Sequence, residues 1–224
     1  MEENKFIAAS TLIIHRMISR SINVAVTRAE EFSQQGFEDE GLEEGYTKYL
    51  TCLMKNLEHH HLVEDEIMFP FFQDRLPNTR FDHLVEDHHK ITALIEAVNS
   101  KLADGEGETT MKGHMDEILP LMTNISDLWF DHIEYEEDIF INIADDFVSQ
   151  DESLALLGNI DDFRNDLFEP FSLTLPFILF NLEPDDRKIM AMELPPEFTE
   201  ELIPHVWKEE WESMSPFFVD DVNG

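Results

Sequence analysis

The sequence predicts an all-α protein: an antiparallel up-down four-helix bundle with a C-terminal helical extension. Four long segments carry apolar residues at alternating steps of three and four, the spacing of one helix face. Glycine and proline gather in a few short stretches between these segments, as is typical of short connections between neighbouring helices. The alternating pattern that indicates strands is scarce.

The four segments are expected to form helices over about residues 5–32, 43–68, 79–102 and 110–147. The first break, 33–45, contains three glycines and many acids, and the third, 103–108, is again rich in glycine. Pro70 and Pro77 bracket the second break. Pro120 is expected to kink the last of these helices or to mark its true beginning.

The chain changes in character near residue 150. Prolines become frequent, and two of the three tryptophans lie beyond this point. Shorter helices are expected there, over about 160–181, 184–192 and 196–213. We therefore divide the chain into a bundle with its site, residues 1–150, and a helical extension packed on it, residues 151–224.

The charge of the chain excludes some classes of partner. There are 49 acids against 15 Lys and Arg, a formal net charge of −34. This field repels nucleic acids and anionic membrane surfaces, so we predict neither nucleic-acid nor membrane binding. Hydrophobic residues make up 42% of the chain, which indicates a folded protein.

The sequence also predicts a cytoplasmic location. Cys52 is the single cysteine, so neither an intrachain disulfide nor a thiolate metal cluster can form, which fits a reducing compartment. The N-terminus lacks the basic and apolar regions of a secretion signal. The most apolar stretch, 171–182, is too short to span a membrane and contains Pro176, so it is expected to be a buried helix.

The segment 43–68 is the most informative, because a histidine and a glutamate interrupt its apolar stripe. The residues at helical steps are Leu53, Leu57, His60, Glu64, Ile67 and Phe71. His60 and Glu64 should therefore lie one turn apart on the face that points into the core. His61 lies at the flank of this face, and His59 is expected to be exposed.

The other three segments show the same kind of interruption. The stripe of 79–102 consists of Leu84, His88, Ile91, Ile95, Val98 and Leu102. The stripe of 110–147 consists of Leu121, Ile125, Leu128, His132, Glu136 and Ile139. The stripe of 5–32 consists of Leu12, His15, Ser19 or Ile18, Ile22, Val26 and Ala29. Each predicted helix thus places one histidine in the core, and two of them add a glutamate four residues later.

A single core histidine has an ordinary explanation, a hydrogen bond to a neighbouring group. Burying four imidazoles and two carboxylates without partners would be costly, however. The repetition across four helices favours a site in which two carboxylates lie across two metal ions in the bundle core. The histidines that we interpret as structural or surface residues are His59, His89, His114 and His205. His83 is undecided, because it precedes Asp87 by four residues but lies off the stripe.

Together these residues resemble the hemerythrin-like superfamily, the HHE cation-binding domain, over roughly residues 5–147. The matching elements are His15, then His60 and Glu64 followed by 69-FP-70, then 87-DHHKI-91 and 129-WFDHIEYE-136. The combination is specific, whereas a single H-x-x-x-E is weak. The stretch 176–190 and Trp207 also resemble, less specifically, a C-terminal extension of some members.

The resemblance implies a four-helix bundle that holds an oxo- or hydroxo-bridged pair of iron ions, with manganese or zinc as possible substitutes. Glu64 and Glu136 would bridge or share the irons. His15 and His60 would serve one iron, and His88 and His132 would serve the other.

The sequence departs from the oxygen-carrying hemerythrins at two positions. Those proteins have a second histidine one turn before the position of His88, where this chain has Leu84. Their last carboxylate is an aspartate five residues after the final histidine, whereas here Glu136 stands at four and Glu137 at five. His61 or water is expected to replace the missing ligand. An iron with an open position favours redox reactivity over simple oxygen carriage.

Three functions remain open, and the sequence does not decide whether the protein is an enzyme. The first is a non-enzymatic di-iron protein that responds to or reacts with O2, NO or iron redox state, with O2, another diatomic or a peroxide as its ligand. The second is a di-iron oxidase, peroxidase-like or NO-processing enzyme whose substrate pocket is partly formed by the extension; we favour the extension as a cover. The third, a metal-free interaction protein, is disfavoured by the coordinated pattern of ligands.

Overall fold

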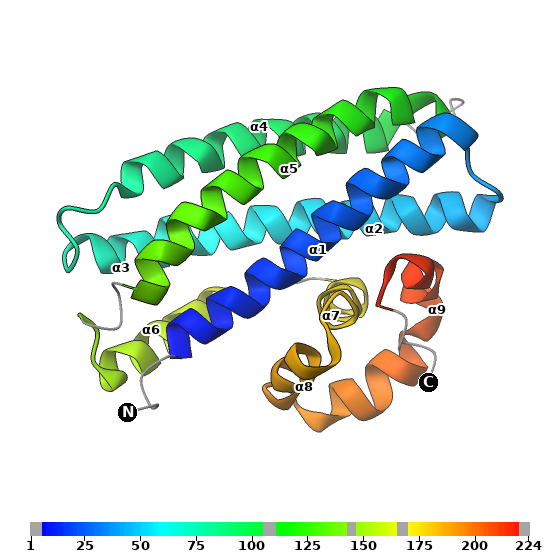
Figure 1. Ribbon diagram of the computed structural model, residues 1–224. Helices are drawn as coiled ribbons and strands as arrows, with labels where there is room; N and C mark the ends of the chain where they lie inside the picture. The colour runs from blue at the N-terminus through cyan, green and yellow to red at the C-terminus, as the bar shows by residue number, and fades with distance from the viewer. Residues whose placement is uncertain (1–5, 105–110, 143–146, 165–169, 220–224) are drawn as a thin grey trace.

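Four long helices lie side by side and make up most of the computed structural model, which describes residues 6–104, 111–142, 147–164 and 170–219 (Figure 1). They are α1 (Phe6–Gln35), α2 (Glu40–Val63), α4 (Phe81–Asp104) and α5 (Met111–Asn142). Every regular element in the described ranges is helical, which confirms the all-α class. α1 and α4 each pack against both α2 and α5, so each buries one face against two neighbours.

The buried face of α4 agrees with the predicted stripe at every position, from Leu84 to Leu102. In α5, Met122 and Trp129 are fully buried and the neighbouring predicted leucines are half-buried. Pro120 lies inside α5, so it does not mark the beginning of this helix. The predicted end of the segment, 143–146, lies outside the described residues.

The second predicted helix, 43–68, is interrupted by one turn of π-helix. This turn spans Glu64–Met68 and leads into the short helix α3 (Phe69–Gln73). The amide of Phe69 donates to the carbonyl of Glu64, five residues back. Pro70 follows and has no amide hydrogen with which to restore the ordinary four-residue pattern. The helical path therefore changes at a predicted site residue.

The π-helical turn shifts the buried face by one residue. A single extra residue rotates the positions after it by about 100° relative to a continuous α-helix. Met68 and Phe72 are consequently buried, whereas the predicted Ile67 and Phe71 are half-buried. The predicted stripe is thus correct as far as Glu64 and wrong beyond it.

The prediction of one helix over 160–181 is wrong. The structure has two helices in this part of the chain, α6 (Gln150–Arg164) and α7 (Phe171–Phe180). Pro170 precedes α7 with an extended backbone (φ −80°, ψ 126°), which ends any helix before it. The start of α6 is fixed by Ser149, whose amide donates to Glu152 Oε2 at 3.0 Å while its hydroxyl oxygen accepts from the Glu152 amide at 3.4 Å. This reciprocal cap is a sequence signal that the prediction missed.

The rest of the extension is helical, as predicted, but partly irregular. α8 (Pro184–Met192) has the predicted bounds. The predicted segment 196–213 consists of a π-helical stretch (Phe198–Val206), α9 (Lys208–Trp211) and a 3-10 turn (Glu212–Phe217). Pro204 and Pro216 lie inside the π-helical stretch and the 3-10 turn, where each lacks the amide hydrogen of a regular helix.

Residues 170–219 pack on the long helices and share their apolar core. Phe177 and Met214 belong to the same buried cluster as Leu50 and Leu53 of α2. The closest approach is at Gly45 of α2, where a Cβ atom would lie 1.9 Å from the carbonyl oxygen of Ser213. Only glycine fits this contact without a shift of the backbone. The division into residues 1–150 and 151–224 stays a prediction.

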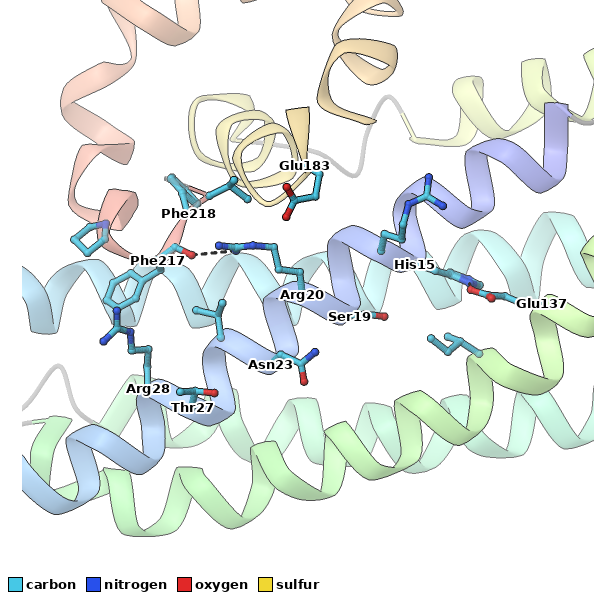
Figure 2. Close-up of a pocket in the computed structure, with 15 residues that line it drawn as sticks. His15, Ser19, Arg20, Asn23, Thr27, Arg28, Glu137, Glu183, Phe217 and Phe218 are labelled. Atoms are coloured by element: carbon cyan, nitrogen blue, oxygen red, sulfur yellow. Dashed lines mark hydrogen bonds and ion pairs between the residues drawn. The ribbon is translucent and has the colours of Figure 1, made fainter. Parts of the chain in front are cut away.

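A groove of about 870 Å³ lies between α1 and the end of the extension (Figure 2). His15 and Glu137 lie near one end of it, and Arg28 lies toward the other. The Arg20 side chain reaches from α1 to the carbonyl oxygen of Phe217, to which it donates at 3.1 Å. The extension therefore forms one wall of a cavity as well as covering the long helices.

Within the described part of the chain, none of the helices combines the length and apolar character that a membrane span requires. The apolar stretch 171–182 forms α7 and its end, and its central residues are buried, as the sequence predicts. These residues pack in the interior beside α2.

Candidate metal centre

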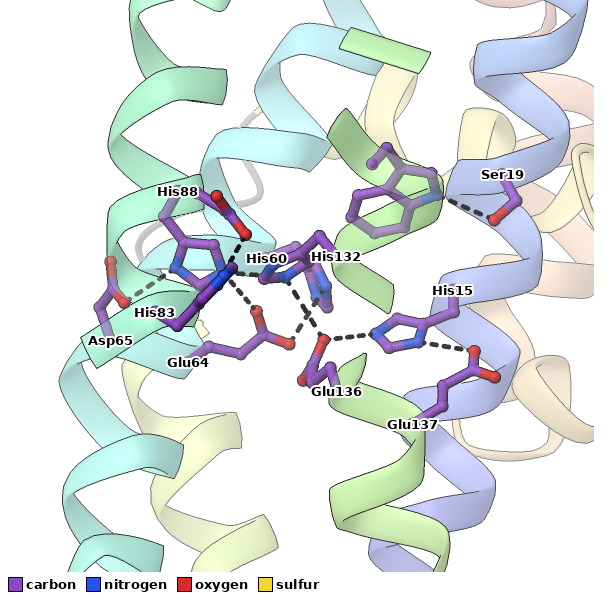
Figure 3. Close-up of polar contacts among 12 residues, drawn as sticks. His15, Ser19, His60, Glu64, Asp65, His83, His88, His132, Glu136 and Glu137 are labelled. Atoms are coloured by element: carbon purple, nitrogen blue, oxygen red, sulfur yellow. Dashed lines mark hydrogen bonds and ion pairs between the residues drawn. The ribbon is translucent and has the colours of Figure 1, made fainter. Parts of the chain in front are cut away.

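A buried polar layer crosses the interior of the four long helices, between two separate apolar clusters. One cluster contains Trp129, and the other contains Phe69, Leu84 and Phe140. The predicted site residues that form the layer are His15 from α1, His60 and His61 from α2, Glu64 from the π-helical turn, His88 from α4, and His132 and Glu136 from α5. Figure 3 shows the labelled members of this set converging from different helices.

The first group in this layer consists of His15, His60, Glu64 and Glu136. One ligand atom from each residue lies within 4.8 Å of the others. His15 Nε2 is 3.3 Å from Glu136 Oε2, and His60 Nε2 is 3.1 Å from Glu64 Oε1. Two ligands on opposite sides of one ion, with bonds of about 2.2 Å, lie about 4.4 Å apart. The first group therefore has the dimensions of a site for one ion.

The second group consists of His61, His88 and His132, again with one ring nitrogen from each within 4.8 Å. The rings of His61 and His88 stack with centroids 4.0 Å apart. The Nε2 atoms of His88 and His132 are 3.1 Å apart. Two facing ring nitrogens are compatible only when a proton or a cation lies between them. His61 of α2 thus adds a third histidine to this group, one that α4 does not provide at position 84. Leu84 is instead fully buried in an apolar cluster.

Glu64 and Glu136 connect the two groups. Glu64 directs Oε1 toward His60 of the first group and lies with Oε2 3.4 Å from His88 Nε2 of the second. Glu136 Oε2 is 3.3 Å from His15 Nε2 and 3.6 Å from His132 Nε2. Each carboxylate thus reaches one histidine in each group. This is the arrangement in which a carboxylate can be shared between two metal ions.

Two further carboxylates bind the outer nitrogens of the layer (Figure 3). Asp65 Oδ1 is 2.8 Å from His88 Nδ1, and Glu137 Oε1 is 2.9 Å from His15 Nδ1. An acid on Nδ1 holds the hydrogen there, so that Nε2 points inward with its lone pair. The prediction missed Asp65 and gave Glu137 no such role. The available signal was an acid directly after each glutamate of the layer, 64-ED-65 and 136-EE-137.

Trp129 encloses the layer on the side of the larger cluster. Its ring contacts the rings of His15 and His60 edge-on, at centroid distances of 5.6 and 5.5 Å. Its indole N–H donates to the Ser19 hydroxyl at 2.9 Å, which fixes the ring. On the other side, Phe69 stacks on His88 at 5.4 Å. These contacts pack aromatic rings against both sides of the polar layer and hold its rings in place.

Charges within the layer set its protonation in the absence of metal. Burial acts to lower the pKa of His15, but Glu136, Glu137 and Glu64 outweigh it and raise that pKa to about 10. Burial acts to raise the pKa of Glu136, but the charge of His15, whose Nε2 lies 3.3 Å from Glu136 Oε2, holds it well below the ordinary value. Burial and the Glu136 charge raise the pKa of Glu64 well above its ordinary value. The metal-free layer therefore pairs a charged His15 with a charged Glu136.

The remaining histidines with shifted pKa values favour their neutral form, which is the form that binds metals. Burial lowers the pKa of His60 and of His61 well below the ordinary value. It also lowers the pKa of His132 to about 4, against the opposing charge of Glu136.

Several atoms of the layer lack a hydrogen-bond partner within the described residues. They are Nε2 of His15 and His60, both ring nitrogens of His61, Nδ1 of His132, and both carboxylate oxygens of Glu64 and Glu136. Buried polar atoms without partners are rare and costly. A cation in each group would satisfy most of them. Imidazole and carboxylate ligands without thiolate suit iron or manganese.

The other histidines of the described chain lie outside both groups. His83, which the sequence left undecided, is 59% exposed and pairs with Asp87 at 3.1 Å. It is therefore a surface residue. His89 and His205 are exposed, and His114 is half-buried. His59 is half-buried rather than exposed, a correction to the prediction. Helix α2 is packed by α1, α4, α6, α7 and the 3-10 turn, which leaves it few open faces.

A family model, the hemerythrin HHE cation binding domain, matches residues 14–144, which is more than half of the chain. The matched range runs from just before His15 to the end of α5 and includes every residue of the two groups. No curated protein and no solved structure is similar enough to the chain to count as a match.

Proposed function

We propose that this chain, which belongs to the hemerythrin HHE cation-binding family, holds two iron ions and uses them to respond to or react with O2, NO or iron redox state. The observation that carries the proposal is the position of Glu64 and Glu136, each of which reaches a histidine in both groups. Manganese or zinc would be substitutes for iron at the same donors. We also propose a cytoplasmic location, which the single cysteine supports.

We propose further that α1, α2, α4 and α5 form an antiparallel up-down bundle. The support is their length and their contacts in a ring. In such a bundle each helix presents its interrupted stripe to the centre. The site then needs no ligand from a loop, which suits a rigid pair of metal positions.

The residues have distinct tasks in this proposal. His15 and His60 would hold one iron, His61, His88 and His132 the other, and the two glutamates would be shared. Iron supplies one-electron redox chemistry and a position for a small ligand when it is bound. Trp129 and Phe69 exclude bulk water from the layer. Asp65 and Glu137 keep a proton on the outer nitrogens of His88 and His15.

Exposure of the reduced, iron-loaded protein to air tests whether it carries or consumes O2. We expect oxidation within minutes, without a stable oxygen complex, because the ligand set differs from that of the oxygen carriers. An absorption spectrum recorded over time, followed by evacuation, measures this. A coloured form that persists and releases O2 under vacuum through repeated cycles would return the protein to the carrier class.

A second candidate function, a di-iron oxidase or related enzyme, is favoured by one observation. The groove beside α1 is lined by His15 and Glu137, and its far wall comes from the extension. A substrate in this groove would lie next to the proposed centre. An oxidase would consume O2 repeatedly when a suitable organic substrate is present, whereas a responder would stop after one oxidation of its metals. Measurement of O2 consumption over time separates the two.

A further inference from the structure

The groove between α1 and the extension is unusual in a chain of net charge −34, because its lining holds more arginines than acids: three arginines against Glu137 and Glu183. Arg16, Arg20 and Arg28 of α1 all line this groove, and Figure 2 labels Arg20 and Arg28. They are three of only 15 Lys and Arg residues in the chain. The general field of the protein repels anions, so an anion would bind only where cations are concentrated.

The three arginines differ in whether a carboxylate pairs with the guanidinium. Asp186 holds Arg16 through two hydrogen bonds of 2.6 and 2.8 Å. Glu31 holds Arg28 at 2.6 Å. Arg20 donates instead to neutral oxygens, Oδ1 of Asn181 at 2.5 Å and the carbonyl of Phe217 at 3.1 Å. Among the described residues, no carboxylate lies within ion-pair distance of Arg20.

Arg20 is also held in place before any ligand arrives. Asn181 is buried, and its Oδ1 accepts a second hydrogen bond from Tyr49 at 2.7 Å. Its amide nitrogen donates to the carbonyl of Phe177 at 2.8 Å. The guanidinium is thus fixed at the wall of the groove, where Nη1 makes both bonds and the other nitrogens are further donors. A preorganised donor loses little freedom on binding, which favours recognition of an anionic group.

The remaining lining indicates the rest of the ligand. Val24, Ile133 and Val219 are half-buried and give the groove apolar walls. From His15 to Arg28 the helix rises by about 20 Å, so the groove accepts an elongated molecule. We propose that it binds an organic carboxylate with an extended apolar body, its carboxylate on Arg20. This inference goes beyond the proposed function and holds whether or not metal ions react with the ligand.

The test uses Val24, which lies four residues from both Arg20 and Arg28 on the same face of α1. Val24→Glu would place a carboxylate between the two arginines and compete with the ligand. Val24→Gln introduces a side chain of nearly the same size as Val24→Glu but without the charge, so it is the matched control. Calorimetric titration with octanoate is expected to show binding to the full-length wild-type chain and to Val24→Gln. Binding to Val24→Glu is expected to be weaker by about tenfold or more.

Two further comparisons keep the proposal falsifiable. Octan-1-ol, which lacks the charge, is expected to bind much more weakly than octanoate. Arg20→Lys is expected to keep part of the octanoate affinity that Arg20→Gln loses. Arg80→Gln, which is not part of the groove lining, should leave the affinity unchanged. Equal binding of octanoate to Val24→Glu and Val24→Gln, equal binding of the alcohol, or no binding to the wild type would overturn the proposal. Iron content measured on the same samples separates this result from a failure of the proposed function.

Discussion

The Nδ1 atom of His88 on α4 lies 2.8 Å from the carboxylate of Asp65, the residue directly after Glu64. The same relationship occurs between His15 on α1 and Glu137, the residue directly after Glu136. In both cases a glutamate faces the centre of the layer and the next acid reaches a histidine of another helix. Each glutamate and its successor therefore orient two parts of the site at once.

Removal of the outer carboxylate should weaken metal binding without removing a ligand. Asp65→Asn leaves His88 in place but no longer holds the proton on its Nδ1 as a carboxylate does. We expect the metal affinity of the second group to fall by about 10- to 100-fold. Metal titration in the presence of a competing chelator measures this. Glu66→Gln, an exposed neighbour of the same charge, is the control and should keep the wild-type affinity.

The three consecutive histidines provide a test of the ligand assignment. His60→Ala and His61→Ala should each lose metal from one position, because these rings belong to the first and second groups respectively. His59→Ala should retain both metals, because this residue lies in neither group. Metal analysis of the three purified variants checks the assignment. Loss of metal from His59→Ala with retention in His60→Ala would show that the helical register is wrong.

Gly45 should be intolerant of a side chain. In Gly45→Ala the added Cβ meets backbone atoms of Ser213, so the 3-10 turn must move away from α2. We expect a loss of about 2 kcal/mol in the free energy of unfolding, and faster hydrogen exchange in residues 212–217. Gly158→Ala in α6 is the matched control, because nothing lies within 4 Å of its Cβ position. That variant should gain about 0.5–1 kcal/mol from helix propensity. An equal response of the two variants would contradict the tight docking of the extension.

The metal-free protein should lose stability as the pH rises. His15 has its pKa raised from 6.5 to about 10 by the neighbouring carboxylates, which overcome the effect of burial. A group whose pKa is raised on folding stabilises the folded state fully below its unfolded pKa. That contribution is lost as the pH rises from 6.5 through about 10. Urea unfolding of the chelated protein across this range should show the decline, and His15→Gln should flatten it. A stability of the wild type that stays constant over the range would argue against the charged pair of His15 and Glu136.

Much of the site could be predicted from the sequence because helical spacing fixes which side chains share a face. The stripe of α4 and the inward positions of His15, His132 and Glu136 follow from this rule alone. The role of His61 could not be derived in the same way. Its ring lies at the flank of the stripe and reaches His88 and His132 only because α2 and α5 both pack against α4.

The parts that the sequence analysis missed depend on local changes in the helical path. The π-helical turn at Glu64 alters the register after the residue that the spacing had placed correctly. Its cause, Pro70, was visible, but a proline can end, kink or widen a helix, and spacing does not choose among these. Helix α6 was missed because its apolar face is short, although its cap at Ser149 and Glu152 was present in the sequence.

The iron content of the protein purified after iron-replete expression tests the central claim most directly. Two groups of donors joined by two shared glutamates predict about two tightly bound irons per chain. Elemental analysis alongside a measured protein concentration gives this number. A content near two, which falls when Glu64 or Glu136 is replaced by alanine, is the expected result. A content of zero or one iron per chain would contradict the account.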